Sequence, residues 1–148
     1  MLDAGSKAEF DQQFRAVQVL YFAMLASLAG YLVIGLVLGS TRVAATVTSP
    51  PGRTFYLLSL GLATPAFFVK KQMVRPILRG SSPAEIKGSL GSFRSGHLVS
   101  YVLCEGVGLV GLVGLFLGGS RIQFINHLGV AFALMVLLRP KRIDFSNL

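Results

Sequence analysis

The sequence predicts an all-α, polytopic membrane protein, folded as a bundle of four transmembrane helices in a single membrane domain covering residues 1–148. Apolar residues make up 53% of the chain and charged residues only 14%, whereas about 25% of the residues in a soluble domain are charged. The mean hydropathy is also strongly positive, at +0.66. The apolar residues gather in four runs, at about residues 17–38, 54–73, 96–118 and 122–138.

The first run follows residues 1–16, which are mixed in charge and contain Phe10 and Phe14. We expect these residues to form a short interfacial helix or a polar lead. A cleaved signal peptide is the alternative, with residues 43–45 (Val-Ala-Ala) as its cleavage site. The run is longer than the roughly 7–15 apolar residues of a signal peptide, and acidic residues precede it. An uncleaved span is therefore favoured.

The second run begins after residues 49–52, Ser-Pro-Pro-Gly, which is a strong turn signal. Its apolar part, residues 54–69, is about 24 Å long as a helix, which is short for a hydrocarbon core of about 30 Å. We expect the helix to continue to Met73, because Lys70 and Lys71 can extend to the headgroups. Pro65 should bend it, since proline lacks the backbone N–H group.

The main polar segment, residues 75–94, contains a helix-start signal. Ser82 is suited to cap a helix, Pro83 to occupy its first position, and Glu85 its third. A helix should begin there and run into the third span, with or without a break near Gly88 or Gly91. The connection to the fourth run, residues 118–121, is tight and predicts an antiparallel hairpin.

Basic residues predict the orientation in the membrane. Eleven of the fourteen Lys and Arg residues would lie on one side of the bilayer and three on the other. The three are Arg42, Arg53 and Arg121. Cytoplasmic loops carry the excess of Lys and Arg, so both termini and the loop at residues 70–95 are expected in the cytoplasm. The bordering charges indicate anionic lipid headgroups as partners and argue against nucleic acid.

Small residues follow one face of the third span. Gly114 and Gly118 are spaced by four, and a further set continues at similar spacing, namely Ser100, Cys104, Gly108 and Gly111. Small faces allow helix backbones to approach closely in lipid. These positions are therefore candidates for helix packing, either within the fold or against another copy or another protein.

Glu105 is the one acidic residue inside an apolar run. His97, Tyr101 and Glu105 are spaced by four and form a polar stripe, with Glu105 about 13 Å inside the span. Charged groups at that depth are costly and are usually partnered or functional. Two interpretations stay open. Glu105 is a structural hydrogen-bonding group, or it is a proton or cation site with Tyr101 as a further donor.

The remaining polar groups predict hydrogen bonds between helices. Gln123, Asn126 and His127 share a face of the fourth span, and His97 belongs to the same class. In an antiparallel hairpin His127 would lie about 12 Å from the level of Glu105, which argues against a shared metal site. No residue set has metal-ligand spacing, and no catalytic residue is predicted.

Residues 105–113, Glu-Gly-Val-Gly-Leu-Val-Gly-Leu-Val, resemble the carboxylate helix of the proteolipid c subunits of rotary ATPases. The preceding loop with Arg75-Pro76 is similar to the basic polar loop of that helical hairpin. The resemblance implies that Glu105 is an ion-binding carboxylate in a ring of copies. The sequence departs from the family in the long loop at residues 75–94 and in having four spans.

These observations predict a small, non-enzymatic integral membrane protein. It would be a subunit or accessory component of a membrane complex, associated with other membrane subunits or with its own copies through the glycine-rich third span. The alternative is a proteolipid-like protein that handles a proton or monovalent cation through Glu105. A small membrane enzyme acting on lipid or quinone is a third interpretation. Apart from a proton or monovalent cation, the sequence does not identify a cofactor.

Overall fold

The computed structural model describes residues 4–41, 52–73 and 83–140, and this part of the chain is helical without strands. It contains α1 (Ala4–Thr41), α2 (Gly52–Met73), α3 (Pro83–Phe116) and α4 (Arg121–Leu137). The predicted all-α class, with one helix for each apolar run, is therefore confirmed.

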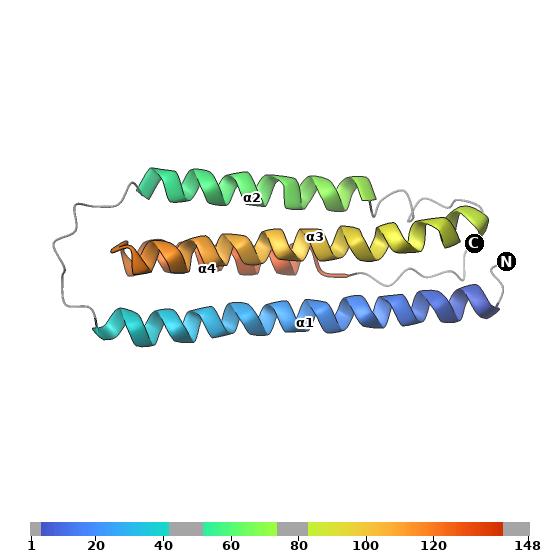
Figure 1. The fold of residues 1–148 in the computed structure, drawn as a ribbon, viewed down its shortest axis with the longest axis horizontal. Coiled ribbons are helices and arrows are strands. Elements are labelled where there is room, and N and C mark those ends of the chain that lie inside the picture. The colour runs from blue at the N-terminus through green and yellow to red at the C-terminus, as the bar shows by residue number, and fades with distance from the viewer. Residues whose placement is uncertain (1–3, 42–51, 74–82, 141–148) are drawn as a thin grey trace.

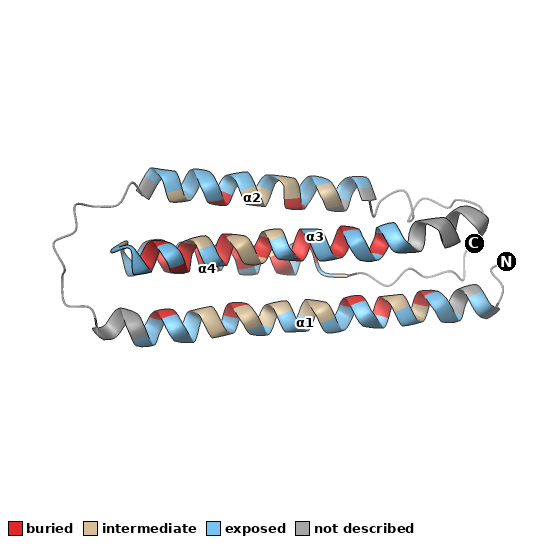
Figure 2. Ribbon diagram, viewed as in Figure 1, coloured by how far each residue is buried: buried red, intermediate tan, exposed pale blue. Residues whose placement is uncertain are grey.

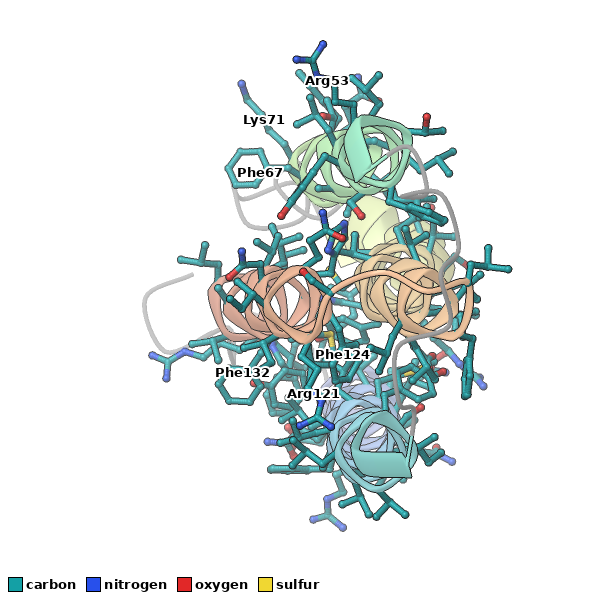
Figure 3. All side chains as sticks on the ribbon, turned by 90° about the vertical axis from the view of Figure 1, so that its left-hand side faces the viewer. Arg53, Phe67, Lys71, Arg121, Phe124 and Phe132 are labelled. Carbon is teal, nitrogen blue, oxygen red and sulfur yellow. The ribbon has the colours of Figure 1, made fainter. Side chains whose placement is uncertain are left out.

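The helices run alternately up and down, so that α1 and α3 begin toward one end of the bundle and α2 and α4 begin toward the other (Figure 1). Viewed end-on, α3 and α4 lie side by side, with α1 below them and α2 above (Figure 3). α3 contacts all three other helices, whereas α1 and α2 have almost no contact with one another. α3 is therefore the central element, and one of its sides lies open between α1 and α2.

Two of the four helices are long and apolar enough to cross a membrane by length and composition. These stretches are Ala8–Val37 in α1 and Gly91–Phe116 in α3. The apolar parts of the other two helices, Arg53–Val69 in α2 and Arg121–Leu137 in α4, are shorter. At 1.5 Å per residue, the 17 residues of α4 extend only about 26 Å.

The amino-terminal residues belong to the first long helix and do not form a separate element. Phe10, Phe14 and Val17 are buried and recur at the spacing of one helix face. The ring of Phe10 lies 5.8 Å from that of Phe93 on α3. An aromatic contact therefore joins the first turns of α1 to α3, where we expected an interfacial helix or a polar lead.

The third span is the second half of a longer helix. α3 begins at Pro83, as the sequence predicts, and passes through Gly88 and Gly91 without a break. Ser82, the predicted cap, lies outside the described residues. α2 likewise continues through Pro65 to Met73.

The turn between α3 and α4 is closed by backbone and side-chain bonds. Gly118 has φ 94°, a conformation that favours glycine, and the Gly119 amide donates to the Gly114 carbonyl at 2.8 Å. Ser120 then caps α4. The Ser120 hydroxyl accepts a hydrogen bond from the backbone N–H of Gln123 at 3.2 Å. In return, the side-chain oxygen of Gln123 accepts one from the backbone N–H of Ser120. This reciprocal pair is a capping box.

Burial is concentrated on α3 and on the faces turned toward it (Figure 2). Tyr101, Cys104 and Val107 of α3 are fully buried, as are Ala131 and Met135 of α4. The outward surfaces of all four helices carry large exposed apolar side chains. Phe67 on α2, for example, points away from the other helices (Figure 3).

Candidate functional site

Glu105 lies midway along the apolar stretch of α3 and is held by α1. The hydroxyl groups of Ser27 and Tyr31 both donate to its Oε1 atom, and the Tyr31 bond is 2.9 Å long. Ser27 and Tyr31 are four residues apart on α1, so one face of that helix presents both hydroxyls. All three side chains are half-buried. They form a polar contact between helices that are otherwise apolar at this level.

Tyr101, expected as a donor to Glu105, has a different hydrogen-bond partner in the structure. Its side chain is fully buried, and its hydroxyl group lies 3.5 Å from the Leu138 carbonyl oxygen at the end of α4. The last carbonyls of a helix lack intrahelical donors, so this hydroxyl supplies one of them. Tyr101 therefore joins α3 to α4, and the hydroxyls that reach Glu105 come from α1.

Ser100 connects α3 to α2. Its buried hydroxyl lies 3.1 Å from the Ala66 carbonyl oxygen of α2 and 2.8 Å from the Gly96 carbonyl oxygen of its own helix. With Glu105 and Tyr101, each of the other three helices is thus linked to α3 by a side-chain hydrogen bond. The polar groups of the apolar stretch of α3 are used to hold neighbouring helices.

The glycines of α3 face helices of the same chain. A Cβ atom added at Gly108 would lie 2.7 Å from Leu28 of α1, and one added at Gly111 would lie 2.6 Å from the Cβ atom of His127 on α4. At Gly114 it would meet the ring of Phe55 on α2 at an ordinary 3.7 Å. The small face is therefore covered by α1, α2 and α4.

Two other predicted packing residues have different surroundings. Cys104 is fully buried and, as the one cysteine of the sequence, forms no disulfide within the chain. Gly118 lies beyond the end of α3, in the exposed turn. The spacing of four between Gly114 and Gly118 therefore reflects a helix-ending turn and not a continuing packing face.

His127 on α4 is buried against α2 and α3. Its Nδ1 atom lies 2.6 Å from the Gln123 carbonyl oxygen, so Nδ1 carries the proton and donates. Its ring stacks on Tyr56 of α2 with a centroid distance of 4.8 Å. The Nε2 atom is buried and has no hydrogen-bond partner among the described residues. His127 thus contacts α2 by ring stacking, while its hydrogen bond stays within α4.

The other predicted interhelical groups are local or aromatic in their contacts. His97 is buried between the rings of Phe93 and Tyr101, at centroid distances of 4.7 and 5.6 Å. The Gln123 side chain belongs to the cap of α4. Asn126 is exposed on the outer side of that helix.

The sequence interpretation did not identify Ser27 and Tyr31. They are two of the few polar side chains in the first apolar run, and their spacing of four was the available signal. In residues 4–41, 52–73 and 83–140, no group of three or more His, Cys, Asp or Glu residues is arranged to bind a metal ion.

Comparison with known proteins gives no relative. No protein family matches the chain, and neither a curated protein nor a solved structure is significantly similar to it.

Proposed function

We propose that this chain is a four-span integral membrane protein and a non-enzymatic component of a membrane complex. The four-span arrangement is supported by the large apolar side chains exposed on the outer surface of every helix, including α2 and α4. In water such a surface would be an aggregation hazard, whereas lipid or a membrane partner covers it without cost. The excess of basic residues supports a cytoplasmic location for both termini.

The non-enzymatic role is supported by one observation: the polar side chains in the middle of the molecule form hydrogen bonds between its helices. Glu105, Ser100 and Tyr101 each contact a group on another helix of the same chain. A catalytic group needs a position from which it can reach a substrate. Groups engaged in this way favour a scaffold that presents its surface to a partner.

The burial of the glycines supports a contact surface elsewhere on the molecule. Gly108, Gly111 and Gly114 are buried against helices of the same chain. The surface available to a partner consists of the outward apolar faces.

Purification from native membranes in a mild detergent tests this function. The tagged chain should elute as a larger species with one or more membrane proteins at constant stoichiometry. A tagged, unrelated four-span protein of similar expression is the control. Elution as an isolated monomer after gentle extraction would contradict the proposed role.

The second candidate is proton or cation handling through Glu105. It is favoured by the half-buried position of the Glu105 side chain beside the two hydroxyls, because these three groups present oxygen atoms that a small ion could bind. A hydrophobic carbodiimide would then modify Glu105, and cations or high pH would protect it. Reconstituted protein should lose cation or proton flux in Glu105→Gln while retaining its fold.

A further inference from the structure

One side of α3 lies open between α1 and α2. It carries large exposed apolar side chains at helical spacing, with the half-buried Glu105 at its α1 edge. We call this surface the outer stripe of α3, and it consists of Leu98, Val102, Glu105, Leu109, Val113 and Phe116. From Leu98 to Phe116 the stripe extends about 27 Å, which is close to the thickness of a hydrocarbon core.

In the described residues, the partners of the Glu105 carboxyl group are hydroxyls and not basic side chains. Ser27 and Tyr31 supply hydrogen bonds to Oε1 but no positive charge. Residues 16–41, 54–69, 95–120 and 122–138, which make up the apolar parts of the four helices, contain no Lys or Arg. On α3 the nearest basic residue before Glu105 is Arg94, eleven residues or about 16 Å away along the helix. If the chain spans the membrane, the carboxylate lies at a depth where ionised groups pair with an opposite charge.

We propose that the outer stripe of α3 binds a transmembrane helix of another protein that places a Lys or Arg side chain beside Glu105. The inference rests on the proposed function, since it assigns the contact surface of that membrane component. The apolar residues on both sides of Glu105 supply packing along the helix. The carboxylate supplies the specificity, because a basic side chain in lipid has few other partners.

Two other occupants fit the stripe less well. A second copy of the chain offers no basic residue at the level of Glu105, because residues 16–41, 54–69, 95–120 and 122–138 contain neither Lys nor Arg. A bare divalent cation such as Ca²⁺ or Mg²⁺ takes six or more oxygen ligands. Only the oxygens of Ser27, Tyr31 and Glu105 meet at this point in the described residues.

Designed helices test this pairing. The full chain, fused to a donor fluorophore at its amino end, is reconstituted in phosphatidylcholine vesicles with an acceptor-labelled leucine–alanine helix. One probe carries a single central Lys, and the other carries Leu at that position. Energy transfer should show at least about tenfold tighter association with the Lys probe, equivalent to 1.4 kcal/mol. Glu105→Gln should remove the difference between the probes.

A second pair of variants tests the surface without altering the carboxyl group. Leu109→Trp enlarges an exposed side chain of the stripe and should block the Lys probe. Val130→Trp, on the outward face of α4, is the matched control, because both residues are nearly half exposed (45% and 48%). This control should bind the Lys probe as the wild type does. Thermal unfolding of each variant shows whether the fold is retained.

Three results would overturn the inference. The first is equal association of the Lys and Leu probes, and the second is a preference for Lys that survives Glu105→Gln. The third is cation-protected carbodiimide labelling of Glu105 with no preference for the Lys probe, which would assign a small ion to the site. If the native chain still purifies with a partner in any of these cases, the proposed function is retained. Only the assignment of the contact to the outer stripe of α3 is then contradicted.

Discussion

At the residue scale, the structural role of a carboxyl group in an apolar helix depends on its hydrogen-bond partners. Glu105 and Tyr31 are 74 residues apart in sequence and meet because α1 lies along α3. Each interhelical bond in lipid stabilises by about 0.6–2 kcal/mol. The contact is therefore a modest contribution to stability but a specific one, since it aligns two long apolar helices that lack other polar contacts at this level.

Removing the Tyr31 hydroxyl tests this contact. Tyr31→Phe keeps the ring and should lower the free energy of unfolding by about 0.6–2 kcal/mol, measured by denaturant unfolding in detergent. Glu105→Leu should cost more than Glu105→Gln, because the amide still accepts from both hydroxyls. Tyr56→Phe, on an exposed tyrosine of α2, is the control. Equal losses from Tyr31→Phe and Tyr56→Phe would contradict the assigned bond.

Glycines on α3 differ in how much space surrounds them. Gly111→Ala would bring two Cβ atoms to 2.6 Å and should destabilise the fold by about 1–3 kcal/mol through overpacking. Gly114→Ala meets only ordinary contacts and should be neutral or gain up to about 1 kcal/mol from the helix propensity of alanine. Thermal unfolding of the two variants gives the comparison. The reverse order of stability would show that α3 and α4 pack in another register.

At the element scale, α3 organises the molecule because it contacts every other helix. Its polar side chains reach α1, α2 and α4, and its glycines let those helices approach. α4 is the shortest helix, and its start depends on Ser120 and Gln123. A short helix gains proportionally more from its cap, since a larger share of its backbone N–H groups lacks intrahelical acceptors.

Loss of the cap should be measurable. Ser120→Ala removes the acceptor for the Gln123 amide and should cost about 0.5–2 kcal/mol. Amide exchange, measured by mass spectrometry, should become faster across residues 121–124. Ser95→Ala, at an exposed position within α3, should leave exchange in α4 unchanged. Unaltered exchange in Ser120→Ala would mean that the cap does not stabilise the start of α4.

At the scale of the whole molecule, the up-and-down arrangement places charges at two ends. In Figure 1, α1 and α3 begin, and α2 ends, toward one end of the bundle. Lys7, Lys71 and Lys87 belong to these helix ends, whereas Arg53 and Arg121 belong to the helix starts at the other end. For the proposed four-span arrangement, the positive-inside rule predicts that the end with these lysines faces the cytoplasm.

Cysteine labelling in intact cells tests this orientation. Ser49→Cys should react with an impermeant thiol reagent, and Ser92→Cys should react only after the membrane is opened. The parent chain is its own control, because its one cysteine, Cys104, is fully buried and should not react. The opposite labelling pattern would reverse the topology. Labelling of both positions in intact cells would rule out a span between them.

The sequence by itself determined the helices of this protein. Apolar runs and their borders are local properties, so four helices, the start at Pro83 and the tight turn after α3 could be predicted. The length of α1 could not, because the burial of Phe10 and Phe14 depends on a surface that α3 provides. Local polarity suggested a separate lead, and tertiary packing extended the helix instead.

Only the tertiary structure decided which helices and side chains are neighbours. A helix that is apolar all round does not indicate which side meets which partner. Tyr101 and Glu105 share a stripe in sequence, yet residues four apart differ by about 40° around the helix axis. In the structure the Tyr101 hydroxyl reaches the end of α4 while its ring packs on Tyr21 of α1, whereas Glu105 accepts hydrogen bonds from α1. The partners of Glu105 and the burial of the glycines therefore follow from the placement of α1 and α4 around α3, which no local pattern encodes.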